Sequence, residues 1–358
     1  MVWIKILLLS TFSLSVFADP PTPPKLLTKH AIDSIRYISM DGRFAYVKKR
    51  QGVLGLISYY RSADFLSENQ ASDFVVHASK AKIRVIIEVI RNSHTEFNFF
   101  KPNKIMAAKF GDPVAKEIGL GQAAKLHLQD EWVTYYKAYE RAIIIQNLIT
   151  QKKYEIRVAN KPNPFFIPDV IMINPETVVY SDINEQGLSA VISYNLLTQA
   201  SSVIYKSSQS GTGIELCQAS DYLAIGEFPF EGVTRGSQIL QVKTNSSFNL
   251  ASYTTIYSSL DQDLGNMVCL DDSIYFAKTM NQDKKLGIKV SEAVKLTLKD
   301  SKVTVRTSLK HVNQLIEMDG RVLAPIRGDH YVLEGEANLG SDTLKSTPNA
   351  NEELPLEI

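Results

Sequence analysis

The sequence is poor in the residues on which metal-binding, redox and nucleic-acid-binding proteins depend. Among its 358 residues there are two cysteines and six histidines, and the formal net charge is only +1. A nucleic-acid partner is disfavoured, because a phosphate backbone attracts a basic surface. Zinc-protease, serine-hydrolase and phosphate-loop motifs are also missing from the sequence. We therefore predict no catalytic residue, no metal site and no cofactor.

Long hydrophobic runs are confined to the start of the chain. Lys5 is followed by the apolar run Ile6–Phe17 and by a small-x-small cleavage site that ends at Ala18. This pattern predicts a signal peptide over residues 1–18. A bilayer-spanning helix needs about 20 apolar residues, and no later segment provides them. We expect a periplasmic or secreted protein without a transmembrane segment.

The end of the chain differs in composition from the rest. From Glu336 onward there is no aromatic residue, and five acids stand against one lysine. This composition predicts a disordered acidic and polar tail over residues 336–358. The region 19–335 is then long enough for one large domain.

Two short phrases occur twice in the sequence. Met40–Arg43 (Met-Asp-Gly-Arg) returns unchanged as Met318–Arg321. Asn147–Gln151 (Asn-Leu-Ile-Thr-Gln) returns as Asn195–Gln199 (Asn-Leu-Leu-Thr-Gln), 48 residues later. Repeats at such a period are typical of one supersecondary unit that is copied around or along an axis.

Strand signals dominate these units, and only residues 115–124 are a candidate for a helical turn. Aligned on their first hairpin, the units begin near Ile35, Asp73, Ala123, Ile167, Gly213, Gly265 and Val312. The spacing predicts an all-β fold, a β-propeller of about seven four-stranded blades over residues 19–335, with six or eight blades as alternatives. The seventh unit holds three strands, so we expect the N-terminal segment 25–32 to supply the fourth and close the last blade.

One hairpin carries a family resemblance. Ile38–Tyr46 resembles the SPDGRxxAF hairpin of WD40-like, TolB-type β-propeller repeats, and Ile316–Ala324 is similar. Met40 and Met318 stand where that motif has proline. The resemblance implies a propeller architecture, and that architecture serves many different functions.

The two cysteines, Cys217 and Cys269, fall in consecutive units. An exported protein meets an oxidising compartment, so a disulfide has to be considered. In our alignment the two residues occupy the same position of their units, and rotationally related side chains point the same way around the axis. Because a disulfide needs converging Cβ vectors, we favour two buried thiols, with a disulfide as the alternative.

Residues that could bind a metal are scattered. His77 and His127 share an inner-strand position and could line a central channel, but we favour polar residues that water or backbone satisfies. The acid pairs that could hold Ca²⁺ are Asp261/Asp263 and Asp271/Asp272. For these pairs, solvated acids in turns are the preferred interpretation.

Two further motif matches have plain explanations. Gly119–Ala124 has a Gly-x-Gly-x-x-Ala spacing, but the strand and helix of a dinucleotide site are missing around it, so we predict a loop. Arg327–Asp329 (Arg-Gly-Asp) falls at a predicted tight turn, where glycine and aspartate are expected.

The most useful functional signal is a set of aromatic loops. In a propeller, the loops from fourth to first strand and from second to third strand share one rim, and three such loops here carry aromatic residues in adjacent units. Aromatic anchors beside an arginine suit a protein-binding hot spot. The candidate contacts are Phe165, Phe166, Phe228, Phe230, Arg235 and Tyr257. Packing of Phe165 and Phe166 between blades is the alternative.

Together these features predict an exported, monomeric β-propeller that acts as a protein-binding or scaffolding module of the bacterial envelope. The alternative is a metal-dependent hydrolase of lactones, esters or glycans, with its site at the mouth of the propeller channel. The hydrolase would need histidines and acids that converge at one mouth, whereas the scaffold needs only rigid loops.

Overall fold

The fold consists of β-strands and their connections in the part of the chain that the structure describes. The structure is a computed structural model, and it describes residues 25–28, 35–38, 44–48, 54–58, 62–63, 71–78, 84–91, 102–109, 116–158, 166–184, 186–229, 236–244, 253–260, 265–283, 288–298, 302–305, 312, 315–318, 321–326 and 329–334. Within these ranges, no helix has the length and hydropathy that crossing a membrane requires. The predicted signal peptide and the predicted tail lie outside the described residues.

The strands pair into antiparallel sheets. The first sheet has the order β1-β27-β26-β25, made of β25 (Ile316–Met318), β26 (Arg321–Ile326), β27 (Asp329–Glu334) and β1 (Lys25–Thr28). The second contains β2 (Ile35–Ile38), β3 (Phe44–Lys48), β4 (Leu54–Ser58) and β5 (Ser62–Ala63). A seven-stranded sheet contains β6 (Ala71–Ala78), β7 (Arg84–Arg91), β8 (Asn103–Lys109), β9 (Lys116–His127), β10 (Trp132–Lys137), β11 (Ala142–Asn147) and β12 (Lys153–Arg157).

Three further four-stranded sheets follow in chain order. One contains β13 (Val170–Asn174), β14 (Thr177–Ile183), β15 (Leu188–Asn195) and β16 (Ser201–Ser210). The next contains β17 (Thr212–Ala219), β18 (Tyr222–Pro229), β19 (Ser237–Lys243) and β20 (Thr254–Ser259). The last contains β21 (Gly265–Leu270), β22 (Ser273–Asp283), β23 (Ile288–Thr297) and β24 (Lys302–Val305).

Strand β9 belongs to two four-stranded arrays. Its first half pairs with β8 up to Gly121, and its second half pairs with β10 from Gln122 onward. Ala123, with φ 55°, lies where the register shifts after this changeover. The seven-stranded sheet is therefore two four-stranded sheets that share one strand, and we call them the β6–β9 sheet and the β9–β12 sheet.

The helical turn predicted at 115–124 and the loop predicted at Gly119–Ala124 are both wrong, because residues 116–124 lie in β9. A Cβ atom on Gly119 or on Gly121 would overlap the Tyr135 ring or its hydroxyl. The two glycines therefore leave the space into which Tyr135 packs, and its side chain is only 1% exposed. Glycine in a strand often marks such a close approach, so packing explains the motif without a cofactor.

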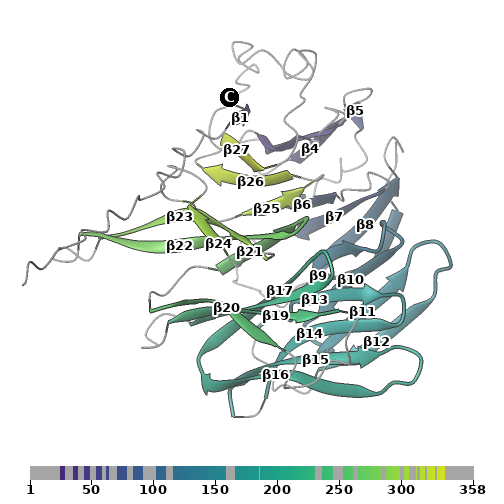
Figure 1. The fold of residues 1–358 in the computed structure, drawn as a ribbon. Helices are drawn as coiled ribbons and strands as arrows, with labels where there is room; N and C mark the ends of the chain where they lie inside the picture. Colours follow the sequence, from purple (N-terminus) through teal and green to yellow (C-terminus); the bar gives the residue numbers. More distant parts are fainter. Residues whose placement is uncertain are drawn as a thin grey trace, which may run out of the picture.

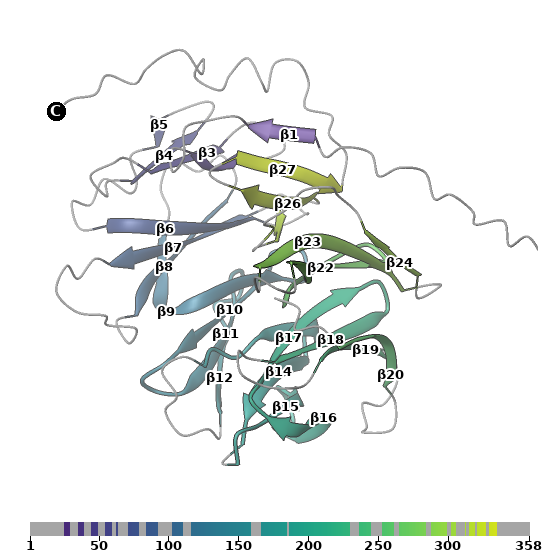
Figure 2. The same cartoon turned by 90° about the vertical axis from the view of Figure 1, so that its left-hand side faces the viewer.

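The sheets follow one another in chain order around a common centre (Figures 1 and 2). Their first strands lie side by side, β9 against β13, β13 against β17, β17 against β21 and β21 against β25. Near the chain ends, β2 contacts β27. We call β9, β13, β17 and β21 the inner strands.

The hydrophobic core is divided into clusters, each between two neighbouring sheets. The β9–β12 and β13–β16 sheets share one cluster, and the β13–β16 and β17–β20 sheets share the next. In the third, Phe276 of β22 packs with Phe228 and Tyr257 of the preceding sheet. Because a strand points successive side chains to opposite faces, each sheet contributes one face to each of two clusters.

The repeated Asn-Leu-x-Thr-Gln phrase is a turn between the third and fourth strands of its sheet. The Asn147 Oδ1 atom accepts hydrogen bonds from the backbone N–H groups of Ile149 (2.9 Å) and Thr150 (2.7 Å). The Asn195 Oδ1 atom accepts the same pair of bonds from residues 197 and 198, at 2.9 and 2.8 Å. Asparagine forms such turns with its own following backbone, so the repeat has a structural cause.

Candidate functional site

One end of the sheets holds the connections from second to third strand and from fourth strand to the next first strand. We call this end the loop rim. Four large apolar side chains are exposed there, Leu120 (37%), Tyr139 (70%), Ile167 (43%) and Leu260 (98%). They are half of the eight exposed large apolar side chains among the described residues. An apolar rim of this kind is typical of a protein-binding surface.

The six aromatic and arginine contacts predicted from the sequence for this rim differ in how exposed the structure shows them to be. Phe166, which lies just before β13, is half-buried and remains a candidate. Phe165, Phe230 and Arg235 lie outside the described residues. Phe228 (6% exposed) and Tyr257 (9% exposed) are buried, so the prediction that they are exposed at the rim is wrong.

The burial of Phe228 and Tyr257 follows from strands that extend further than the sequence pattern indicated. β18 continues to Pro229, so Phe228 lies within the strand and its ring packs over the space left by Gly226. Tyr257 lies within β20, and its ring centroid is 4.9 Å from that of Phe276 in the next sheet. Both rings stabilise the contact between two sheets.

The opposite end of the sheets holds the connections from first to second and from third to fourth strand, and we call it the turn rim. In four consecutive sheets the same backbone bond joins the two connections. The carbonyl oxygens of Glu131, Glu176, Asp221 and Asp272 accept hydrogen bonds from the N–H groups of Leu148, Leu196, Thr244 and Leu298, at 2.7 to 2.9 Å. These four acids therefore occupy equivalent places, and all four are exposed.

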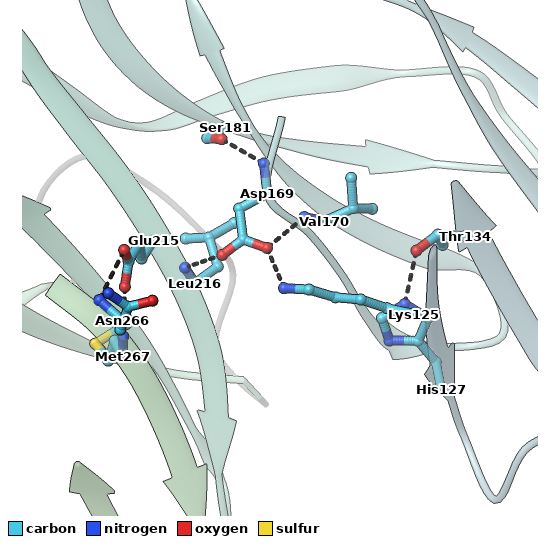
Figure 3. A network of polar contacts seen from close by, with 10 residues as sticks. All are labelled: Lys125, His127, Thr134, Asp169, Val170, Ser181, Glu215, Leu216, Asn266 and Met267. Carbon is cyan, nitrogen blue, oxygen red and sulfur yellow. Dashed lines mark hydrogen bonds and ion pairs between the residues drawn. The ribbon is translucent and has the colours of Figure 1, made fainter. Parts of the chain in front are cut away.

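Between the two rims, polar side chains connect one inner strand to the next (Figure 3). Lys125 on β9 forms an ion pair with Asp169, the residue before β13. The other carboxylate oxygen of Asp169 accepts a hydrogen bond from the Leu216 N–H of β17, at 2.7 Å. One carboxylate thus connects three consecutive inner strands.

Glu215 continues this series from β17 to β21. Its carboxylate accepts hydrogen bonds from the backbone N–H groups of Asn266 (2.9 Å) and Met267. Asn266 has φ 55°, and the pairing of β21 with β22 shifts register at this point, so a bulge turns both N–H groups toward the carboxylate. Gly265 leaves the necessary space, because a Cβ atom there would lie 2.7 Å from a Glu215 oxygen.

The electrostatics of Glu215 combine opposing effects. Burial raises the pKa of the Glu215 carboxyl above its ordinary value of 4.5, and the Asp169 carboxylate adds to this increase. The hydrogen bonds from Met267 and Asn266, together with Lys125, lower the pKa. Since its oxygens accept backbone bonds, this carboxylate acts as a connector between strands and is poorly placed to serve as a general base.

His127 lies near this series and is neutral. Its Nε2 atom is 2.8 Å from the Thr134 hydroxyl. Burial, with a smaller contribution from Lys125, lowers the pKa of His127 to about 3. The prediction that this histidine is satisfied within the protein agrees with the contact, although the partner is a side-chain hydroxyl.

A metal-dependent hydrolase needs several metal ligands close together. The described residues contain no such group. Among them, no group of three or more His, Cys, Asp or Glu side chains is placed to hold a metal ion. Asp271 and Asp272 are exposed residues of a turn, whereas Asp261, Asp263 and the side chain of His77 lie outside the described residues.

Cys217 and Cys269 form a disulfide, with their Cα atoms 5.6 Å apart, so the prediction of two thiols is wrong. The alignment of the two units on which the prediction of thiols was based was wrong by one residue. Cys217 precedes its first turn, which begins at Ser220, by three residues, while Cys269 precedes the turn at Asp271 by two. Since side chains alternate along a strand, this offset points the two sulfurs toward each other, and both pack against the same cluster.

A second buried carboxylate connects the β13–β16 and β17–β20 sheets close to the loop rim. Glu227 of β18 has 0% exposure. It accepts hydrogen bonds from the Tyr205 hydroxyl (2.6 Å), from the Ser207 hydroxyl and from the Gln238 amide. Three donors satisfy the carboxylate, as burial of a charged group requires.

The role of Lys125, Asp169 and Glu227 as structural connectors was not predicted from the sequence. Each bonds to residues 11 to 47 positions away, so no local spacing marks the contact. The signal that was available is a charged residue within an apolar strand run, as at Glu227 between Gly226 and Phe228. Such a residue is expected to have a buried partner.

Comparisons with known proteins bear on the fold. No protein-family model and no curated protein sequence match the chain. Among solved structures, the chain is similar to the β-propeller domain of Cps50 (Swd1) from Myceliophteria thermophila, with 9% identity, a TM-score of 0.52, and coverage of 87% of this chain and 99% of that one.

Two further solved structures have the same kind of similarity. The WD40 repeats of RRP9 match with 8% identity and a TM-score of 0.53, and U3-55K matches with 8% identity and a TM-score of 0.51. In both cases the match covers 87% of this chain and 99% of the other. At such identity the likeness shows the fold alone. The fold is a WD40-like β-propeller, as the sequence predicts, and the TolB-type assignment stays a prediction.

Proposed function

We propose that this chain is an exported seven-bladed propeller that binds a protein partner through its loop rim. The observation that carries the proposal is the exposure of Leu120, Tyr139, Ile167 and Leu260 at that rim. Exposed large apolar side chains that a rigid fold presents suit a binding surface, because little ordering cost is added on association.

Seven blades are supported by the strand pairing. Division of the seven-stranded sheet at β9 yields two of the seven, and the remaining sheets are four-stranded. In the sheet of β25 to β27, the fourth strand is β1, which pairs antiparallel with β27. The proposed ring therefore closes through the N-terminal strand, and closure removes the edges that would otherwise pair with other chains.

Export is supported by the cysteines. The two cysteines of the chain are joined in one disulfide. Disulfides persist in oxidising compartments and are rare in the cytosol. Together with the signal-peptide pattern of residues 1–18, the disulfide favours a periplasmic or secreted protein. Within the bacterial envelope we propose a monomeric scaffold whose partner is a protein.

Site-specific photo-cross-linking in the cells that make the protein tests this proposal. A photoreactive residue is placed at Tyr139 or at Ile167, and at Val203 in β16 as a control. Val203 is matched in exposure (45% against 43% for Ile167) but lies on an outer strand. We expect a discrete cross-linked protein from Tyr139 and Ile167 only. Equal cross-linking at all three positions, or none at the rim, would contradict partner binding by the loop rim.

A further inference from the structure

At the β6–β9 and β9–β12 sheets, the turn rim carries an excess of positive charge. Its exposed or half-buried basic side chains among the described residues are those of Arg84, Lys109, Lys116, Lys152 and Lys153. Its acids are Glu117, Asp130 and Glu131, and the Glu117 carboxylate is paired with the Lys104 ammonium group at 3.7 Å. Of the two other acids, Asp130 is buried, with 1% exposure. The exposed charge of this part of the rim, which we call the basic corner, is therefore mainly positive.

Contacts between strands gather these basic groups. Lys109 is the cross-strand partner of Arg84. Lys116 pairs with Ala107, which lies on the same strand as Lys109. The Arg84 guanidinium donates a hydrogen bond to the Asp130 carbonyl oxygen at 2.7 Å, and this bond joins the β6–β9 sheet to the first turn of the β9–β12 sheet. The two sheets therefore meet at the basic corner.

The turn that carries Ile149 belongs to the same corner. The Leu148 N–H donates to the Glu131 carbonyl oxygen at 2.7 Å, and the Asn147 N–H donates to the Lys152 carbonyl oxygen at 2.8 Å. Ile149 lies in this turn and is 57% exposed. A fixed backbone therefore holds an exposed aliphatic side chain close to exposed lysines.

The later sheets give the described part of the turn rim the opposite charge. The exposed acids there are Glu176, Asp221, Asp271 and Asp272, and the exposed base is Lys243. An acidic segment is attracted by the basic corner and repelled by these acids. The charge of the rim thus favours one place for such a segment.

The sequence supplies an acidic segment that starts at this rim. Glu334, the last residue of β27, pairs with Val322 near the start of β26, at the turn-rim end of that sheet. Residues 335–358 follow, and from Glu336 onward they hold five acids and one lysine. Fully extended, a segment of this length reaches about 80 Å, whereas a folded domain of about 300 residues has a radius of gyration of about 20 Å. The basic corner is therefore within reach.

Within this segment, residues 352–358 (Glu-Glu-Leu-Pro-Leu-Glu-Ile) combine three acids with three large aliphatic residues. Leu354, Leu356 and Ile358 alternate with other residues, so an extended backbone points their side chains to one side. Pro355 favours an extended conformation of the residue before it. The composition predicts no fold of its own for the tail, and such segments become ordered when they bind.

We propose that residues 352–358 dock on the basic corner of the same chain. Their carboxylates pair with the lysines, and their aliphatic side chains cover Ile149. Single exposed ion pairs contribute little, but a tether supplies an effective concentration in the millimolar range, at which weak contacts are sufficient. The docked segment covers the basic corner against other acidic molecules. Because the basic corner lies at the other end of the sheets from the loop rim, the inference does not depend on the proposed function.

Photo-cross-linking within the full chain tests where the segment lies. A photoreactive residue replaces Leu356, and mass spectrometry identifies the cross-linked peptides. We expect cross-links within one chain to peptides that contain residues 109–116 or 147–153, with a yield that does not depend on protein concentration and that falls as salt is added. Cross-links mainly to the later sheets or to the loop rim, cross-links spread evenly over the surface, or none at all would overturn the proposal.

Charge variants test the pairing. Lys152→Glu with Lys153→Glu should lower the cross-linking yield at least about fivefold. The matched control, Lys206→Glu with Lys243→Glu, reverses two exposed lysines of other sheets and should change the yield less than about twofold. Addition of Glu352→Lys and Glu353→Lys to the first variant should restore the cross-link, which a misfolded variant would not allow. Equal losses in the two lysine pairs, or no restoration, would contradict the pairing.

A variant of the tail alone tests whether the basic corner is covered. The neutral-tail variant carries Glu352→Gln, Glu353→Gln and Glu357→Gln and leaves the described residues unchanged. Fluorescence anisotropy measures its affinity for a labelled peptide with the sequence of residues 350–358. We expect the peptide to bind this variant at least about threefold more tightly than the wild type, in which the tethered segment competes. Equal affinity for the two proteins would show that the tail does not cover this surface.

The neutral-tail variant also separates this inference from the proposed function. Photo-cross-linking of a partner from Tyr139 is repeated in this variant. Unchanged cross-linking at Tyr139 together with tighter peptide binding supports two independent surfaces. Loss of cross-linking at Tyr139 would mean that the tail acts at the loop rim, which contradicts the inference.

Discussion

The two rims of this propeller are built from the same strands, yet they differ in regularity. At the turn rim, one backbone hydrogen bond recurs in four consecutive sheets, and two of its turns have nearly the same sequence. At the loop rim, the connections differ from sheet to sheet, and four large apolar side chains are exposed. Because the turns of the turn rim repeat, the architecture can be recognised from them in the sequence. The connections of the loop rim vary from sheet to sheet. Variable connections on a rigid framework are where binding specificity is expected.

The connections between sheets also differ between the two ends. The disulfide of Cys217 and Cys269 lies toward the turn rim, close to the turns at Ser220 and Asp271. The Glu227 carboxylate with its three hydrogen-bond donors lies toward the loop rim. One end is therefore held by a covalent bond and the other by a buried polar network.

Removal of the disulfide should have the largest effect on stability. It closes a loop with a sequence separation of 52 residues, for which the chain-entropy model gives about 4 kcal/mol. We expect Cys217→Ser with Cys269→Ser to lower the free energy of unfolding by about 2 to 4 kcal/mol, measured by denaturant titration. Wild-type protein under reducing conditions should show the same loss. If oxidised and reduced protein unfold at the same denaturant concentration, the disulfide contributes nothing.

Truncation of the buried carboxylate at the other end should cost slightly less. Glu227→Ala leaves the donors of Tyr205, Ser207 and Gln238 without their acceptor and creates a small cavity, so we expect a loss of about 3 kcal/mol. Glu292→Ala serves as control, since Glu292 is a half-buried glutamate of the neighbouring sheet. A loss at Glu227 no larger than the loss at Glu292 would show that the network does not stabilise the loop-rim end.

The pH dependence of stability should show the contribution of His127. The pKa of this residue is lowered to about 3 in the folded protein, against an ordinary value of 6.5. Below pH about 6.5 the unfolded chain therefore binds a proton that the folded protein does not, and stability falls as the pH falls toward 3. Between pH 7.5 and pH 5 we expect a loss of about 1 to 2 kcal/mol, because His127 as a whole residue is half-buried.

The His127→Gln variant supplies the control for this prediction. Between pH 7.5 and pH 5, the loss of unfolding free energy in this variant should be about 1 to 2 kcal/mol smaller than the loss in the wild type. Glutamine retains hydrogen-bonding groups near Thr134 but does not titrate. Identical pH profiles for wild type and variant would rule out a contribution from His127.

Substitutions in the repeated turns should affect stability less than the changes described above. Asn147→Ala removes the acceptor of two backbone N–H groups and should cost about 1 kcal/mol, and Asn195→Ala should cost a similar amount. Tyr139→Ala at the loop rim should change stability by less than about 0.5 kcal/mol, because its side chain is 70% exposed. A larger loss at Tyr139 than at Asn147 would reverse the comparison between the two rims.

The parts of the fold that the sequence predicts are those that repeat locally. The unit starts at Gly213 and Gly265 lie within one residue of the first residues of β17 and β21, because turn residues and strand runs recur at each. The disulfide was mispredicted because a strand reverses its side chains with each residue, and the alignment was wrong by one. No spacing argument resolves that offset without the turn geometry at Ser220 and Asp271.

The candidate surfaces were harder to predict, for a related reason. Whether an aromatic residue such as Phe228 or Tyr257 is buried depends on where a strand ends and on which neighbouring sheet its face meets. The sequence places these residues near loops, but it does not determine which neighbouring sheet their side chains will contact. The Lys125–Asp169 ion pair spans 44 positions, and proximity of this kind arises only from the packing of one sheet on the next.

Affinity and stability measured on one variant show directly whether the loop rim binds a partner. Tyr139→Ser with Ile167→Ser removes two exposed side chains of the loop rim, and the measurement is its affinity for the partner found by cross-linking, together with its melting temperature. We expect an affinity loss of at least about tenfold with a melting temperature close to that of the wild type. Unchanged affinity, or affinity and melting temperature that fall together, would contradict a binding role for this rim.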